Sequence, residues 1–362
     1  MHNNEIAVIY GKNPKEMVKR LLENINLGSG WKKEATIALK PNLVVSKKAS
    51  SGATTSPEMV EGVIVYLQQQ GFKNLTIMES SWIGDSTTKA FKVCGYEEIS
   101  KKYQVPLLDL KKDATKTVKI KDLDLKVCAS VYDVDVFINL PVLKGHCQTK
   151  MTCALKNMKG CIPDDEKRRY HTLGLHKPIA YLNKALKQDV VIVDGMMGDL
   201  NFEEGGTPVE MDRIIVGRDP VLIDSYIAEL MGYNIEDIPY IPISAELGIG
   251  STNLRDAVVT EYDIDNKNIN TMKASSEVAR LAKYIIDQDA CSACYGTLIH
   301  ALQRLKDKGK LDVLGEKIYI GQGYRGQASE GIGIGLCTSK FARSVGGCPP
   351  KAKDIVAFLE EE

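Results

Sequence analysis

The sequence predicts an α/β protein with a mostly parallel sheet, helices on both faces, and a smaller C-terminal α/β module that contains cysteines. The first observation is a recurring order of apolar strand, polar loop and amphipathic helix, which is typical of a parallel sheet. The second is length, because 362 residues exceed the size at which single cores usually stop growing. We therefore predict a body over residues 1–252 and a module over residues 275–362.

The first part of the chain supplies most strands of the predicted sheet. Short apolar stretches predict strands, and apolar residues at i, i+3 and i+4 predict helices. The helix after the polar loop 46–56 has Ser56 as N-cap and Pro57 at its first position. The expected strands are residues 6–10, 35–39, 75–79, 105–108 and 134–140, with a two-stranded excursion in 117–127, and the expected helices are 14–24, 57–71 and 87–93.

The next part continues the pattern and then changes character. Residues 189–193 and 213–216 are predicted strands, and the expected helices are residues 148–159, 179–185, 220–232 and a short region within 235–247. Residues 253–270 are polar and acidic, so we expect them to connect the two domains. The module begins at about residue 275.

Residues 138–163 carry the densest set of candidate functional groups. Pro141 ends the buried strand 134–140, and a polar loop with Lys144 and His146 follows. Loops after parallel strands are where open α/β sheets place ligands, and helix N-termini there attract anions. The cationic loop therefore predicts a carboxylate or phosphate site, with a solvated basic helix face as the alternative. A regular helix over 148–159 would put Lys156 roughly 15 Å from its start, so Lys144 and Lys156 share a site only if the helix is short or bent.

Polar side chains follow four of the predicted strands. They are Lys40 and Asn42, Glu79 with Ser80 and Ser81, Lys144 and His146, and Asp194. If these strands are adjacent and parallel, the side chains converge on one rim. Lys144 would then pair with an anion and His146 would act as acid or base. His171 is a further candidate for chemistry, because histidine changes protonation near neutral pH.

Four cysteines mark the C-terminal module. Cys291 and Cys294 form a C-x-x-C at the start of a predicted helix, Cys337 follows a predicted strand, and Cys348 lies in a Gly-Gly-Cys-Pro-Pro turn. Four thiolates suit either Zn²⁺ or a [4Fe–4S] cluster. One close pair plus two single cysteines, the last followed by proline, favours the cluster. Zinc is the main alternative, and a redox disulfide or core cysteines are the others.

Composition narrows the classes of partner. The chain has 47 basic and 47 acidic residues, and this balance argues against a nucleic-acid binder. The N-terminal residues do not resemble a signal peptide, and no apolar stretch approaches the ~18 residues that span a bilayer. We therefore expect a cytoplasmic protein with reduced cysteines and no membrane partner.

The sequence resembles the large prokaryotic "domain of unknown function" family numbered 362. The resemblance covers roughly residues 35–250, and the matching pieces include KPNL at 40–43, TTSP at 54–57, INLPVLKGH at 138–146, ALKNMKG at 154–160, His171, VDG at 193–195 and DP at 219–220. It implies an α/β fold and an association with iron–sulfur modules, but not a reaction. Many members carry a ferredoxin segment with closely spaced cysteines, whereas this chain has the dispersed set of four.

These observations predict an iron–sulfur protein in two parts, an oxidoreductase or electron-transfer protein. The body binds an anionic small molecule, the module binds one [4Fe–4S] cluster, and a redox partner protein is possible. The expected ligand-binding residues are Lys40, Asn42, Thr55, Lys156, Asn157 and Asp194. The alternatives are a non-catalytic electron carrier or binding module, and a hydrolase or transferase with zinc.

Overall fold

The chain folds into two units, each with its own sheet. A computed structural model describes residues 1–205, 207–268, 277–311 and 315–361. The first unit, here called the body, comprises Met1–Tyr170 and His176–Ala274, and the second, the module, comprises His171–Leu175 and Ser275–Glu362.

An eight-stranded, mostly parallel sheet forms the centre of the body. Its spatial order is β12-β1-β11-β10-β7-β2-β3-β4, and β11 is antiparallel to both of its neighbours, β1 and β10, whereas the other neighbours are parallel. The predicted fold class is therefore confirmed. The strands are β1 Glu5–Tyr10, β2 Ile37–Pro41, β3 Leu75–Glu79, β4 Leu107–Asp109, β7 Val136–Leu140, β10 Val190–Asp199, β11 Pro208–Gly217 and β12 Val258–Tyr262.

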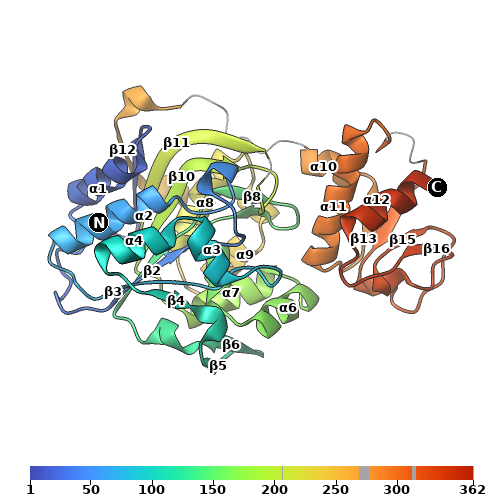
Figure 1. Cartoon of the computed structure of the whole chain (residues 1–362), viewed down its shortest axis with the longest axis horizontal. Helices are drawn as coiled ribbons and strands as arrows, with labels where there is room; N and C mark the ends of the chain where they lie inside the picture. The colour runs from blue at the N-terminus through green and yellow to red at the C-terminus, as the bar shows by residue number, and fades with distance from the viewer. Residues whose placement is uncertain (206, 269–276, 312–314, 362) are drawn as a thin grey trace. The chain divides into compact units, whose positions relative to one another are not determined.

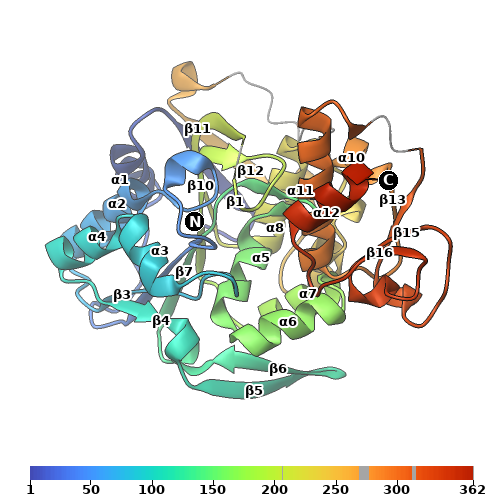
Figure 2. The ribbon, with the colours of Figure 1, turned by 45° about the vertical axis from the view of Figure 1, so that its right-hand side comes forward.

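Helices cover both faces of this sheet. In Figure 2, α1, α2 and α4 lie on one side of the sheet and α5, α7 and α8 on the other. Ser56 caps α2 as predicted, since its side chain accepts the Met59 N–H. A β-carbon at Gly62 would collide with Val18 of α1, so glycine allows these two helices to pack closely. The helices of the body (Figure 1) are α1 Pro14–Asn24, α2 Pro57–Gln69, α3 Thr87–Val93, α4 Tyr96–Tyr103, α5 Ala154–Asn157, α6 Asp164–Thr172, α7 His176–Ala185, α8 Pro220–Leu230 and α9 Tyr240–Glu246.

The prediction of one helix over residues 148–159 is wrong. A small antiparallel hairpin, β8 Lys144–His146 with β9 Lys150–Thr152, comes first, and α5 and a 3-10 turn, η4 Met158–Cys161, follow. The His146 ring accepts the N–H groups of Gln148 and Thr149 and so stabilises the hairpin turn. The Asp224 carboxylate accepts the first N–H groups of α5. These long-range bonds decide where the helix begins.

The expected connection over residues 253–270 is also wrong, because its middle part is a strand of the body sheet. Val258–Tyr262 forms β12, which pairs in parallel with β1 at the edge of the body sheet. Residues 269 and 270 lie outside the described residues. The two-stranded excursion is confirmed as a hairpin of β5 Thr115–Ile120 and β6 Leu123–Cys128. Strands β10 and β11 extend well beyond the predicted 189–193 and 213–216, because they pair with each other along their length.

The module contains a four-stranded parallel sheet in the order β13-β14-β15-β16. Its helix α11 buries Leu298, Ile299 and Leu302, and α12 buries Ile355 and Leu359. The elements are β13 Ile285–Asp287, β14 Ile318–Ile320, β15 Ile332–Ile334, β16 Arg343–Val345, α10 Glu277–Ala282, α11 Ser292–Asp307 and α12 Ala352–Glu361. In the described parts of both units, none of the helices has the length and apolar character needed to cross a membrane.

Candidate functional site

The carboxyl ends of β10, β7, β2 and β3 meet at one edge of the body sheet. These strands are neighbours and mutually parallel. The four groups of polar residues predicted to converge therefore lie on, or just after, four adjacent strands. Parallel strands of an open sheet bring their following loops together, which is the usual position of a ligand site.

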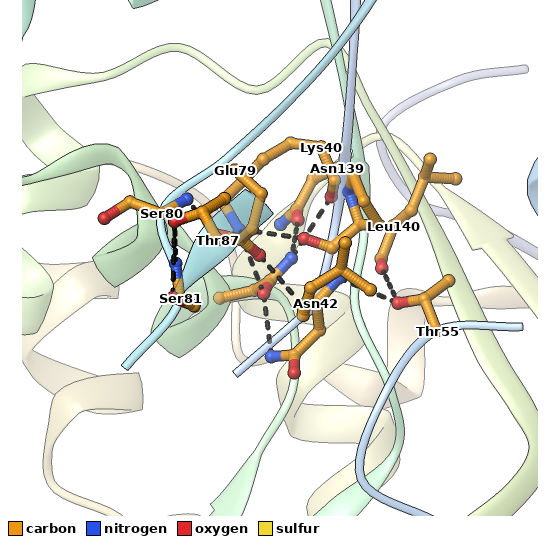
Figure 3. A network of polar contacts seen from close by, with 12 residues as sticks. Lys40, Asn42, Thr55, Glu79, Ser80, Ser81, Thr87, Asn139 and Leu140 are labelled. Atoms are coloured by element: carbon orange, nitrogen blue, oxygen red, sulfur yellow. Dashed lines mark hydrogen bonds and ion pairs between the residues drawn. The ribbon is translucent and has the colours of Figure 1, made fainter. Parts of the chain in front are cut away.

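A buried ion pair lies at the base of this edge. The Lys40 ammonium is fully buried and lies 2.9 Å from the Glu79 carboxylate. The same carboxylate accepts the N–H groups of Leu43 and Ser80 (Figure 3). Buried charges require such a set of partners to offset their desolvation. Gly160 packs directly over the pair, and a β-carbon there would collide with both charged groups.

Three asparagines extend this network. The Asn157 side-chain oxygen accepts from Lys40 and from Asn42, and its amide donates to the Asn139 side-chain oxygen at 2.7 Å. Figure 3 shows the polar groups from β2 and β7 pointing toward one another. Thr55 accepts the Asn42 N–H and donates to the Leu140 carbonyl. The predicted site residues Lys40, Asn42, Thr55 and Asn157 are thus brought together, as a buried frame whose polar groups have protein partners.

Lys144 joins this frame to the neighbouring loops. Its ammonium donates to the Asn42 side-chain oxygen at 3.0 Å, the Ala53 carbonyl at 2.6 Å and the Glu203 carbonyl at 2.9 Å. Burial lowers the pKa of Lys144 to about 7. With three acceptors, the nitrogen holds two loops in place.

His146 is a buried hydrogen-bond donor. Its Nδ1 accepts two backbone N–H groups, so in the neutral ring the proton is on Nε2, which lies 3.2 Å from Glu203 Oε2. Burial, and then the nearby Lys156, lower the pKa of His146 to about 4. Protonating Nδ1 would break both backbone bonds, which is consistent with that direction. The ring is therefore neutral at pH 7.

Glu203 is the site residue that sequence reasoning missed. Its Oε1 lies 2.5 Å from the Lys156 ammonium, whose side chain is only 2% exposed. Burial by itself would raise the pKa of Glu203, but Lys156 and His146 lower it well below its ordinary value. Glu203 belongs to the loop between β10 and β11, four residues after the end of β10, the strand that contains the predicted Asp194. That position after a sheet strand was the available signal, but nothing local distinguishes Glu203 from Glu204.

Two further lysines complete the charge distribution. The Lys167 ammonium donates to both the side chain and carbonyl of Ser80 and to the Ser81 carbonyl. Lys159, in η4, is half-buried, and among the residues described by the structure its ammonium has no hydrogen-bond or ion-pair partner. Burial, and then Lys156, lower the pKa of Lys159 to about 7. The site is therefore cationic, with Glu203 as the carboxylate between Lys156 and His146.

Comparison with known proteins identifies the family of this chain. Residues 37–229, more than half of the chain, match the family described as "Domain of unknown function (DUF362)". This chain belongs to the DUF362 family. The predicted resemblance is confirmed, and the match contains the whole frame and Glu203. The family match does not by itself show an association with iron–sulfur chemistry.

One curated relative and one solved structure are similar to this DUF362 protein. The thylakoid-associated protein sll1697 of Synechocystis sp. is 27% identical over 243 residues, which is 65% of this chain and 75% of the relative. The lactate racemase apoprotein of Thermoanaerobacterium thermosaccharolyticum has a TM-score of 0.41 and 12% identity. That match covers 62% of this chain and only 57% of the racemase.

Other predicted residues of this DUF362 protein lie away from the Glu203 carboxylate or in the other unit. Asp194 accepts the N–H groups of Ser56 and Met196, and burial raises its pKa to about 6. It fastens the start of α2 to β10. His171 belongs by its contacts to the module unit, so its participation in a site with Lys144 stays a prediction.

The four predicted cysteine ligands all lie at element ends of the module. Cys291 caps α11, Cys294 lies in its first turn, Cys337 lies in the turn after β15, and Cys348 follows β16. Burial, and then the other three thiols, raise the pKa of Cys294 to about 12. Because the other three thiols act on Cys294 electrostatically, the four thiols lie near one another, and none of them is in a disulfide. Within the described ranges, however, no three Cys, His, Asp or Glu side chains are already arranged as a metal site.

The chemistry of this donor set fits an iron–sulfur cluster. Four free thiols come from a helix start and two turns, and such turns leave backbone N–H groups near the sulfurs. Arg325 also donates to the Cys337 sulfur at 3.4 Å, so a cationic side chain lies beside one of the four sulfurs. The set thus has the right ligand type and number for one cluster or one zinc ion.

Proposed function

We propose that this DUF362 protein is an iron–sulfur protein whose body binds a small carboxylate and whose module binds one [4Fe–4S] cluster. Bound in the module, the cluster would supply one-electron transfer, either to the bound molecule or to a redox partner protein. The proposed ligands are Cys291, Cys294, Cys337 and Cys348. The nine cysteines are all unpaired, which supports work in a reducing compartment such as the cytoplasm.

The observation that carries the body's proposed role is the position of the Glu203 carboxylate. It contacts the Lys156 ammonium with one oxygen and the His146 Nε2 with the other. A buried lysine and a fixed imidazole N–H are the groups that bind a small carboxylate. Glu203 thus marks where the carboxylate of a ligand would lie, once the β10–β11 loop moves aside.

The buried frame beneath this position would not contact the ligand; it would hold in place the residues that do. Lys144, Asn42 and Asn157 use their polar groups on one another and on backbone carbonyls. Their role would be to hold the hairpin β8–β9 and helix α5, which carry His146 and Lys156. Mutating Lys144 and Lys156 separately to Ala tests this division. We expect Lys156→Ala to abolish ligand binding directly, and Lys144→Ala to lower the stability of the whole site.

The experiment that tests the anion site is thermal unfolding with oxalate, malonate, lactate and phosphate. We expect at least one of the carboxylates to raise the melting temperature of the native protein and to lose that effect in Lys156→Ala. Lys150→Ala is the matched control, since Lys150 is 41% exposed and pairs with Asp237 on the surface. A protein that none of the four anions stabilises would argue against the site.

Metal analysis after anaerobic purification tests the module. Four iron and four sulfide per chain, with a reversible redox transition, support the proposal. A colourless protein with one zinc per chain would replace it with a structural zinc site and a hydrolase or transferase activity. A redox-active cluster in a protein that binds no anion would indicate an electron carrier without catalysis of its own.

A further inference from the structure

Three lysines of the body have a pKa below that of an ordinary surface lysine. Burial lowers the pKa of Lys144 and of Lys159 to about 7, and that of Lys167 to about 8. An amine in this range is partly neutral at physiological pH and therefore nucleophilic. A nucleophile also needs a nitrogen that is not engaged by other groups.

Only one of the three meets this second condition. The Lys144 nitrogen has three oxygen acceptors, and the Lys167 nitrogen has Ser80, Ser81 and Asp164 around it. The Lys159 nitrogen has no such acceptor within the described part of the chain. Its side chain is half-buried, whereas the side chain of Lys144 is fully buried.

Lys159 also lies beside the carboxylate position already described. It follows Lys156 by three residues across α5 and η4, and residues at this spacing share one side of a helical turn. The charged groups that face it are Lys156, Glu203 and Lys167, and Lys159 in turn acts on His146. An amine next to a second cation, in a partly desolvated site, is the arrangement that activates a lysine toward carbonyl carbons.

We propose that Lys159 forms an imine with a 2-oxo acid whose carboxylate takes the place of the Glu203 carboxylate between Lys156 and His146. This inference rests on the proposed anion site and specifies its ligand class. A 2-oxo acid carries its carbonyl carbon directly on the carboxylate carbon. Lys156 would hold the charge while Lys159, one turn further on, reaches the carbonyl.

The step is balanced without an external reactant. The neutral Lys159 nitrogen attacks the carbonyl carbon, a C–N bond forms, and the former carbonyl oxygen takes up a proton. That oxygen then leaves as water while the nitrogen loses its remaining protons to give a C=N bond. Nothing is oxidised or reduced. The His146 Nε2–H would orient the carboxylate, since its Nδ1 is held by two backbone donors.

Reductive trapping tests the proposal directly. The full-length protein is incubated at pH 7 with glyoxylate or pyruvate and cyanoborohydride, and the adduct is located by peptide mass spectrometry. We expect one adduct per chain on Lys159, reduced about tenfold or more in Lys159→Arg and unchanged in Lys150→Arg. Dihydroxyacetone, which has a carbonyl but no carboxylate, should label Lys159 far more slowly. Labelling spread over surface lysines, or undiminished in a folded Lys159→Arg protein, would overturn the proposal.

A pH series adds a second readout. Labelling of Lys159 should rise through about pH 7, whereas exposed lysines should rise only as the pH approaches their ordinary value of ~10.4. A Lys159 profile that matches the exposed lysines would count against the assignment.

Failure of the imine and failure of the anion site give different results. If lactate stabilises the protein through Lys156 but pyruvate leaves no adduct on Lys159, the imine is wrong and the anion site stands. If neither lactate nor pyruvate stabilises the protein and no adduct forms, the anion site is wrong and the imine with it.

Discussion

Lys156 and Glu203 form a salt bridge at 2.5 Å although 47 residues separate them in the sequence. The lysine comes from α5 and the glutamate from the β10–β11 loop. The bridge leaves Lys156 2% exposed and Glu203 26% exposed. The salt bridge therefore holds the β10–β11 loop against α5. It also places the Glu203 carboxylate where it would compete with a carboxylate ligand for Lys156.

We expect Glu203→Gln to lower stability and to raise affinity for carboxylates. Gln keeps the size and a hydrogen bond but leaves Lys156 without its counter-charge, which should cost about 1–3 kcal/mol of unfolding free energy. Urea unfolding with and without oxalate measures both effects. Glu204→Gln is the matched control, and an equal oxalate response in wild type and Glu203→Gln would contradict the competition.

Lys40→Met should destabilise the protein strongly. The substitution leaves the buried Glu79 carboxylate without its cation. Breaking a buried ion pair in this way lowers the free energy of unfolding by about 3–5 kcal/mol. The double variant Lys40→Met with Glu79→Gln should lose less than the sum of the single changes, because the uncompensated charge is removed. Chemical denaturation of the four proteins measures the coupling. Strict additivity would show that the pair contributes nothing as a pair.

His146 should remain neutral, with its proton on Nε2, from pH 8 down to about pH 5. The unfolded ring binds a proton near 6.5 while the folded ring does so only near 4. The unfolded state thus binds more protons between these values, so acidification over that window lowers the His146 contribution to stability. Nitrogen-15 NMR of the ring reports the tautomer. The difference in unfolding free energy between wild type and His146→Gln should shrink as the pH falls from 6.5 to 4, and a ring that titrates at 6.5 would refute this.

Replacing any one of Cys291, Cys294, Cys337 or Cys348 by Ser should remove most of the iron and sulfide from the protein. The four thiols are electrostatic neighbours, and loss of one ligand weakens the whole cluster. Cys147→Ser should leave the metal content unchanged, because Cys147 lies in the body. Iron, sulfide and zinc analysis under anaerobic conditions decides the outcome. Metal loss from the Cys147 variant alone would move the proposed site to the body.

The alternation of strands and helices predicted the fold class correctly, and the polar residues at the ends of the predicted strands indicated the location of the candidate site. Both are local signals, because burial on a sheet selects apolar residues and strand ends receive polar loops. The same reasoning misplaced residues 148–159 and 253–270. In the first segment, His146 and Asp224 form hydrogen bonds from outside the segment. In the second, β12 forms because it pairs with β1, a strand at the other end of the body's sequence.

The sequence by itself therefore determined the fold class, which strand ends carry charge, and which four cysteines belong to one module. Tertiary structure decided which charges meet. The predicted helix over 148–159 would have placed Lys156 far from Lys144. The hairpin β8–β9 takes the place of the first part of that helix, and Lys144 donates to the Glu203 carbonyl while Lys156 donates to the Glu203 carboxylate. Tertiary structure also decided that the Lys144 nitrogen has three acceptors, whereas the Lys159 nitrogen has none among the described residues. The physical reason is that a lysine's pKa and reactivity depend on burial and on partners from distant segments, which no local pattern of residues encodes.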